Sequence, residues 1–164
     1  MEPRIEIIPE KKLVGRSIQM SLNNNKTGWL WSNFMPKLKD IAGKVGKDKY
    51  SLQVYGSDYF SNFDPNREFV KWAMVEVTNF ENIPTDLETF TLKGGQYAVF
   101  IHKGDTTEFY KTAQYIYGVW LPNSAFELDD RPHFEVLGNK YKNNDPASEE
   151  EVWIPVKRRG NLNH

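Results

Sequence analysis

The sequence predicts an α+β fold, in which a duplicated strand–helix–strand–strand unit forms an antiparallel sheet with pseudo-twofold symmetry and a central cleft. Three observations support this. The order strand, helix, strand, loop, strand occurs twice along the 164 residues. Apolar side chains follow a helical period in one segment of each copy and alternate in the flanking segments. A shift of 79 positions also superposes matching residues, for example Met74 on Trp153.

The first copy contains a helix between apolar strands. The segment after Leu13 and the segments 50–55 and 69–77 read as strands, and a short apolar stretch begins at Ile5. The helix is expected over 29–41, where one apolar stripe consists of Leu30, Phe34, Leu38 and Ile41. Pro36 lies inside this helix and should kink or split it, because proline removes a hydrogen bond to the preceding turn.

The second copy has clearer boundaries. Residues 90–102 read as a long strand or a strand pair broken at Gly94-Gly95. Asp105 with Glu108 three residues later resembles a capping box, which predicts a helix that runs to about Trp120 and ends before Pro122. A short strand over 134–137 and a closing strand over 151–156 complete the unit.

The shift of 79 positions defines the expected repeat. It carries the stripe of the first helix onto apolar or aromatic residues of the second, namely Phe109, Ala113, Tyr117 and Trp120. We therefore expect one domain over residues 1–164, with repeats at about 5–80 and 87–157.

The closing strand carries the candidate site. Successive strand side chains point to opposite faces, so Val152, Ile154 and Val156 should face the core, whereas Glu151 and Trp153 share the other face. A carboxylate beside an indole can hold an organic cation by charge and by the ring face. The alternative is that Glu151 is simply solvated at the start of a strand. Pro155 has no N–H to donate, so this strand is expected at a sheet edge or to end there.

The repeat extends this candidate site. The shift of 79 places Trp72 and Met74 on the face that Glu151 and Trp153 occupy in the second copy. A pseudo-twofold axis would bring these faces together as a cleft, the usual form of a small-molecule site. Tyr117 and Trp120 of the second helix are expected to join it, although the same periodicity suits plain core packing.

Composition excludes several classes of function. The chain has no cysteine and a formal net charge of −1, so neither thiolate chemistry nor a basic nucleic-acid or membrane surface is expected. No apolar run is long enough to span a bilayer, and no signal peptide follows Met1. No metal-ligand spacing or Gly-x-Ser-x-Gly motif occurs. We expect a cytoplasmic protein without metal or cofactor and without direct DNA or membrane binding.

Five short motifs resemble the GyrI-like effector-binding domains, which also lie C-terminal to the DNA-binding parts of some AraC- and MerR-type regulators. The motifs are Ile83-Pro84, Tyr97 to Phe100 with His102-Lys103-Gly104, Tyr115 to Gly118 with Trp120-Leu121-Pro122, Asp130-Arg131-Pro132 with Phe134-Glu135, and Glu151 to Val156. The resemblance implies a duplicated strand–helix–strand–strand fold whose cleft binds lipophilic, often cationic, compounds. It also implies that Glu151 corresponds to a buried glutamate that supports cation binding in several members.

The resemblance leaves three functions open. The first is a multidrug-type binding module for a lipophilic, cationic small molecule, with Glu151 as the anionic anchor. The second is a small hydrolase of reactive cyclopropane-type compounds, with Glu151 as general base and Tyr117 or Trp120 steadying a developing charge. The third is a protein-interaction role such as gyrase protection, with an unknown partner. The chain leaves no room for a helix-turn-helix before Ile5 or after Val156, so we expect a stand-alone member.

Overall fold

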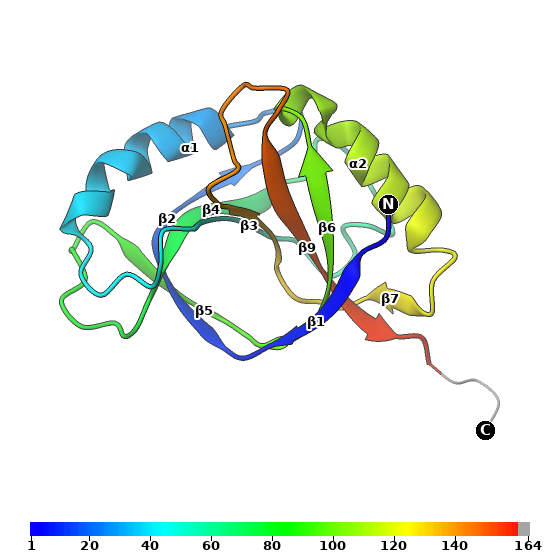
Figure 1. Ribbon diagram of the computed structural model, residues 1–164, viewed down its shortest axis with the longest axis horizontal. Helices are drawn as coiled ribbons and strands as arrows, with labels where there is room; N and C mark the ends of the chain where they lie inside the picture. The colour runs from blue at the N-terminus through cyan, green and yellow to red at the C-terminus, as the bar shows by residue number, and fades with distance from the viewer. Residues whose placement is uncertain (161–164) are drawn as a thin grey trace.

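One antiparallel sheet curls around a packed concave face, and both helices lie on its outer, convex face (Figure 1). The computed structural model describes residues 1–160, so the last four residues of the predicted domain lie outside the described residues. Within that range, the strand order is β1-β6-β9-β8-β3-β4-β2-β5, and a short strand β7 pairs with β9. The predicted α+β fold is confirmed.

The first half contains β1 (Arg4–Ile8), β2 (Lys11–Met20), α1 (Thr27–Phe34), the 3-10 helix η1 (Met35–Asp40), β3 (Lys49–Val54) and β4 (Phe69–Val77). The second half contains β5 (Glu88–Leu92), β6 (Gly95–Lys103), the 3-10 helix η2 (Thr106–Glu108), α2 (Phe109–Tyr115), the π-helix η3 (Ile116–Trp120), β7 (Phe126–Leu128), β8 (His133–Leu137) and β9 (Glu149–Arg158).

The inner strands of the two halves carry aromatic residues opposite the predicted site residues. Tyr50 of β3 pairs with Met74, and Phe134 of β8 pairs with Trp153. Strands β3 and β8 pair with each other, with Ser51 opposite Glu135, and thus join the halves at the middle of the sheet. The limits of the two repeats, about 5–80 and 87–157, remain a prediction.

The helices follow a different shift. Leu30 and Phe34 are the buried residues of α1, and their counterparts Thr112 and Ile116 are buried beneath the second helix. These pairs are 82 residues apart, so the 79-residue alignment misplaced the second helix by three residues. An apolar stripe recurs every three to four residues, so a shift by one turn still superposes apolar on apolar.

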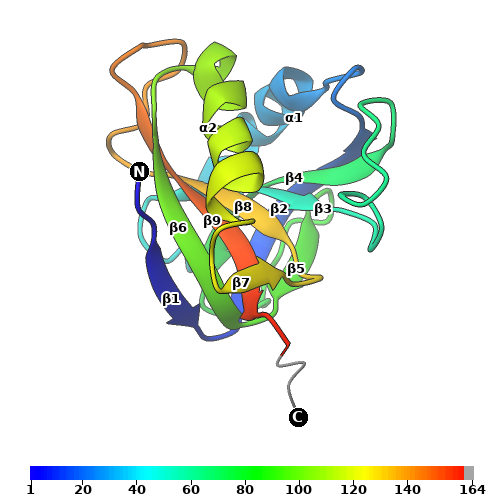
Figure 2. The ribbon, with the colours of Figure 1, turned by 90° about the vertical axis from the view of Figure 1, so that its right-hand side faces the viewer.

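Side chains on the two faces of the sheet form separate cores. The concave face holds a cluster built around Tyr97, Phe134, Met74 and Trp153. On the convex face, α1 packs on apolar residues of β2 and β4, and α2 with η3 packs on β6 and β9. Figure 2 shows α2 in front of β6 and β9. Within residues 1–160, no helix is long and apolar enough to cross a membrane.

The helix ends follow the local sequence signals. The α-helix stops at Phe34 and continues as the 3-10 helix η1, with Pro36 in its first turn, as the predicted split requires. The carboxylate of Asp105 accepts a hydrogen bond from the N–H of Thr107 at 3.0 Å, which makes it the N-cap of the 3-10 helix η2 that leads into α2.

The prediction that Pro155 marks an edge or an end of its strand is wrong. Strand β9 runs on to Arg158 and lies inside the sheet, between β6 and β8. Pairing with β8 ends at Trp153 and pairing with β7 begins at Val156, which leaves Pro155 in the gap. The carbonyl of Pro155 accepts a hydrogen bond from the N–H of Asp129, on the side of β9 that faces β7 and β8. The nitrogen of Pro155 points to the same side, into the gap, so its missing N–H removes no hydrogen bond between strands.

Candidate functional site

The face that carries Glu151 and Trp153 is the concave one. Trp153 is 7% exposed and belongs to the concave core, where its ring stacks on Phe134 at 5.3 Å and meets Tyr97 edge-on at 5.7 Å. Its Nε1–H donates to Glu151 Oε1 at 3.0 Å. Val152 lies on the other face beneath α2. The indole is thus fixed in position and orients the carboxylate beside it.

The carboxylate and the indole already hold a cation. Nη2 of Arg4 donates to Glu151 Oε2 at 2.9 Å, and the Arg4 guanidinium carbon lies 5.7 Å from the centre of the Trp153 ring. Arg4 reaches this position because β1 pairs with β6, with Arg4 opposite Val99. The Glu151 side chain is 33% exposed, so it is neither buried nor fully solvated.

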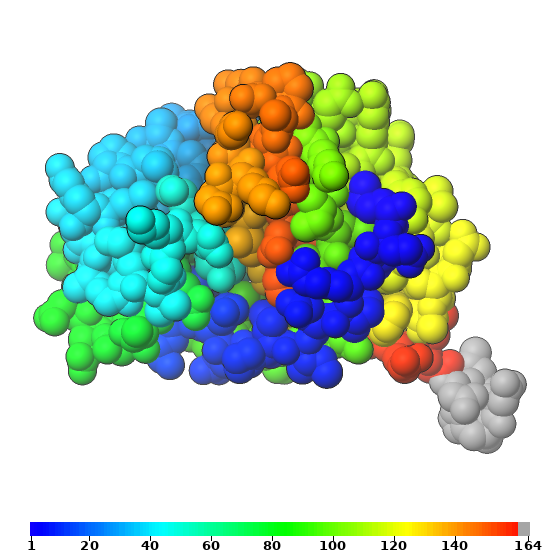
Figure 3. All heavy atoms as spheres, in the orientation of Figure 1, coloured from blue at the N-terminus to red at the C-terminus, as the bar shows by residue number. Residues whose placement is uncertain are grey.

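A cavity of about 740 Å³ opens beside Glu151. Ile101 and Val136 of the concave face form apolar parts of its wall. Most of the other residues that line the cavity are charged, with both signs present, namely Lys47, Asp48, Lys49, Lys140, Glu149, Glu150 and Glu151. In the space-filling view, the segments around residue 50 (cyan) and residue 140 (orange) and the N-terminal strand (blue) surround a recess (Figure 3). The volume lies within the range of about 300–1,000 Å³ that is typical of small-molecule pockets.

Trp72 and Met74 lie on the concave face as well, but in the other half. Met74 is fully buried, and Trp72 is half-buried with its ring 5.1 Å from that of Phe90. Both belong to the same apolar cluster as Trp153. Neither lines the cavity beside Glu151, because packed side chains such as Tyr50 and Phe134 fill the middle of the concave face.

The expectation that Tyr117 and Trp120 share this face is wrong. Both belong to the cluster beneath α2 on the convex face. The hydroxyl of Tyr117 lies 3.0 Å from Nδ1 of His133, and Trp120 stacks on Phe126 at 6.1 Å. Helical periodicity places residues toward a sheet but does not say which of its faces the helix covers. Trp120 lines a different cavity of about 440 Å³, together with residues from the N-terminal segment and η3.

Besides Arg4, three polar residues of the concave face were not among the predicted site residues, namely Glu76, Lys11 and Tyr50. Glu76 of β4 accepts from Lys11 Nζ at 3.3 Å and from the hydroxyl of Tyr50 at 3.5 Å. Burial, and after it the charge of Glu76, raises the pKa of Tyr50 well above its ordinary value. Tyr50 therefore stays a neutral hydrogen-bond donor. Alternation within each strand was visible in the sequence, but cross-strand neighbours depend on the register.

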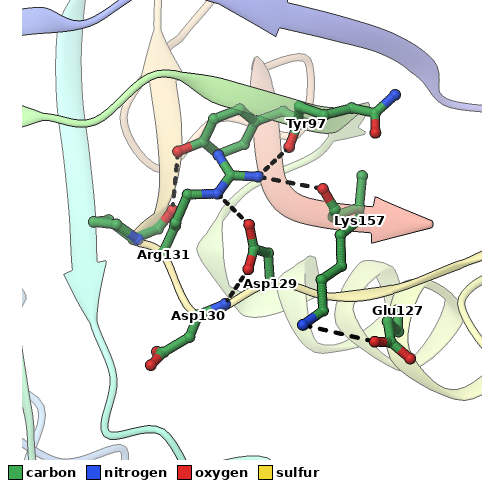
Figure 4. Close-up of polar contacts among 9 residues, drawn as sticks. Tyr97, Glu127, Asp129, Asp130, Arg131 and Lys157 are labelled. Atoms are coloured by element: carbon green, nitrogen blue, oxygen red, sulfur yellow. Dashed lines mark hydrogen bonds and ion pairs between the residues drawn. The ribbon is translucent and has the colours of Figure 1, made fainter. Parts of the chain in front are cut away.

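Arg131 fixes the lower end of the concave face (Figure 4). Its guanidinium lies over the ring of Tyr97 at 4.6 Å and donates to the carbonyl of Gln96 at 2.5 Å and to the carboxylate of Asp129 at 2.7 Å. A Cβ on Gly95 would lie 2.5 Å from Nη1 of Arg131 and would push the guanidinium aside, and the φ of 153° at this residue also favours glycine. The segment before β8 is thereby tied to β6, and Tyr97 is held within the concave core.

A second group of ionisable side chains is buried on the convex face between the two halves. Lys71 Nζ lies 3.8 Å from Glu135 Oε1, which also accepts from Gln53 at 3.0 Å. Burial, with the nearby charge of Glu135 adding to it, raises the pKa of Glu150 to about 7. Burial lowers the pKa of His133 to about 3, so this imidazole is neutral near pH 7. Among the described residues, no group of three or more His, Cys, Asp or Glu side chains is arranged to hold a metal.

Comparisons with known proteins agree with this architecture. The chain is 28% identical over 158 residues to the transcriptional regulator BrlR of Pseudomonas aeruginosa; the match covers 95% of this chain and 56% of BrlR. The chain thus spans little more than half the length of that curated relative.

Two solved structures share the fold. The structure of SAV2435 bound to tetraphenylphosphonium matches with a TM-score of 0.70 and 17% identity, over 96% of this chain and 94% of that one. A hydrolase encoded by lin2189 from Listeria innocua matches with a TM-score of 0.63 and 12% identity, over 95% of this chain and 92% of that one. The model of the GyrI-like small molecule binding domain matches residues 1–157. The chain therefore belongs to the GyrI-like small molecule binding domain family.

Proposed function

We propose that the cavity beside Glu151 binds a lipophilic organic cation, with Glu151 as its anionic anchor. The ring of Trp153, which lies next to that carboxylate but outside the cavity lining, is the aromatic partner of the cation. The observation that carries the proposal is that this pair already holds a guanidinium, at 2.9 Å from the carboxylate and 5.7 Å from the ring centre. A ligand cation would use the same two interactions. The binding of tetraphenylphosphonium, a lipophilic cation, by SAV2435 supports this chemistry.

Affinity and selectivity come from different residues. Apolar groups such as Ile101 and Val136 contribute by losing contact with water, at roughly 25 cal/mol for each Å² buried. Glu151 discriminates by charge, because it favours a cation over a neutral molecule of the same shape. Trp72 and Met74 act from the other half of the concave face by supporting the packing around Trp153.

The test compares a cation with a neutral relative. Tetraphenylphosphonium and triphenylphosphine oxide are titrated against the wild type and Glu151→Gln, with Trp fluorescence and calorimetry as readouts. Glu151→Gln keeps the shape and removes the charge, so the cation should bind more weakly by roughly 1–3 kcal/mol, whereas the oxide changes little. Glu127→Gln is the matched control, since it removes the same charge from β7, where Glu127 pairs with Lys157.

Equal losses for the cation and the oxide would show that Glu151 is structural and that charge selection is wrong.

Hydrolysis is the second candidate function, favoured by the likeness to the Listeria innocua hydrolase. In that role Glu151 would be the general base, but Tyr117 and Trp120 lie on the far face and cannot assist it. Mass spectrometry of a cyclopropane-containing compound after incubation separates the two functions, because a binding protein returns it unchanged.

A further inference from the structure

We infer that Arg4 is an internal cation that occupies the position of the ligand's charge, so that a cationic ligand must displace it and Arg4 sets the affinity threshold for cations. The inference rests on the function proposed above and assigns a specificity-determining role to a residue of the edge strand β1.

Arg4 and a cationic ligand compete for the same atoms. Glu151 Oε1 accepts from the indole N–H of Trp153 at 3.0 Å, and Oε2 accepts from Arg4 at 2.9 Å. Both carboxylate oxygens therefore have a partner, and the guanidinium also lies over the Trp153 ring. A ligand cation can use Oε2 and the ring face fully only when Arg4 has left.

The contact is weak enough to open. The side chains of Arg4 and Glu151 are 45% and 33% exposed, and an ion pair that is this exposed is weakened by solvent screening and contributes little to stability. Among the described residues, β1 pairs only with β6, so the other edge of β1 is free of strand neighbours (Figure 1).

A second carboxylate can retain Arg4 after it leaves. Arg4 Nε lies 3.5 Å from Glu6 Oε2, and the Glu6 side chain is 41% exposed. Residues 4 and 6 point to the same face of β1, so Arg4 can turn to Glu6 by a change of rotamer, without unfolding the strand. Neutral ligands do not compete for Glu151 Oε2, so their affinity does not depend on Arg4.

The experiment measures Kd for tetraphenylphosphonium and triphenylphosphine oxide in the wild type, Arg4→Gln, Glu151→Gln and the double variant at low salt. Arg158→Gln is the matched control, because Arg158 is an exposed arginine on β9 whose guanidinium carbon lies 5.5 Å from the ring centre of Phe126. It changes the net charge equally and leaves Glu151 untouched. All variants are checked for wild-type circular dichroism.

Arg4→Gln should tighten tetraphenylphosphonium binding about two- to fivefold, the range of an exposed ion pair. Arg158→Gln should change it by less than about 1.5-fold, and the oxide should be unaffected. In the Glu151→Gln background, Arg4→Gln should have no effect. Suppose that Glu151→Gln weakens tetraphenylphosphonium binding, but Arg4→Gln changes the Kd no more than Arg158→Gln does, or raises it. The role of Arg4 is then overturned and the proposed function stands. If Glu151→Gln has no charge-specific effect, both fail.

Discussion

Glu150 is half-buried beside Glu135 and Lys71, and its raised pKa makes it a source of pH-dependent stability. Its pKa is raised to about 7 because burial disfavours the carboxylate and Glu135 repels it, while Lys71 opposes the shift. In the unfolded chain the pKa returns to its ordinary value of 4.5. The folded state therefore holds this proton more tightly, and its contribution to stability is full below the unfolded pKa and lost as the pH rises through about 7.

Glu150→Gln tests this directly, because glutamine resembles the protonated acid at every pH. The shift from 4.5 to about 7 corresponds to roughly 3 kcal/mol at about 1.36 kcal/mol for each pKa unit. The side chain is only partly enclosed, so solvent screening reduces this to about 1–2 kcal/mol. We expect Glu150→Gln to stabilise the fold by that amount at pH 8 and to have little effect at pH 5.

Urea unfolding at pH 5, 6, 7 and 8 measures the free energy of unfolding for the wild type and for Glu150→Gln. Groups such as His133 titrate in both proteins, so only the difference between the two is used. Glu149→Gln removes the same charge from the preceding residue, which points to the opposite face, and should show no gain between pH 5 and 8. The reasoning is refuted if Glu150→Gln is no more stable than the wild type at pH 8, or if Glu149→Gln gains equally.

Two further substitutions test the packing on which the site depends. Phe34→Ala should lower the free energy of unfolding by about 3–5 kcal/mol in denaturant melts, because the Phe34 side chain is fully buried between α1 and the sheet. A loss below about 1 kcal/mol would contradict its place in the core. Trp29→Ala is the control and should cause only a small loss, because Trp29 is 56% exposed. Gly15→Ala should lower the melting temperature sharply or prevent folding, because its Cβ would lie 1.8 Å from the carbonyl oxygen of Ala73. Gly28→Ala is its control, since a Cβ there meets nothing within 4 Å and alanine favours the helix; equal stability of the two variants would disprove the close approach of β2 and β4.

The sequence was most informative where the signal is local. Strand alternation placed Val152 and Trp153 on opposite faces of the sheet, because neighbouring strand residues point to opposite sides, and the two residues lie in separate clusters. Pro36 and Asp105 marked helix boundaries because their effects act within one turn. The shift of 79 residues pairs Met74 with Trp153, and both lie in the apolar cluster of the concave face.

The sequence was least informative where two distant segments meet. Tyr117 and Trp120 had suitable chemistry and spacing, but the helix that carries them covers the convex face. The strand β7 was missed because three residues are too short for a periodic pattern. Pro155 was placed at an edge because its missing donor was visible, whereas the gap that accommodates it between β7 and β8 was not.

The class of fold and the position of Glu151 beside Trp153 follow from the sequence alone, since they depend on periodicity and on residues two apart on one strand. The group that faces this carboxylate emerged only from the folded chain. Arg4 lies 147 positions away along the chain and reaches Glu151 because β1 joins the sheet next to β6. Pairing between strands depends on the register of the whole sheet, which the free energy of all its contacts sets together, and no local pattern records it.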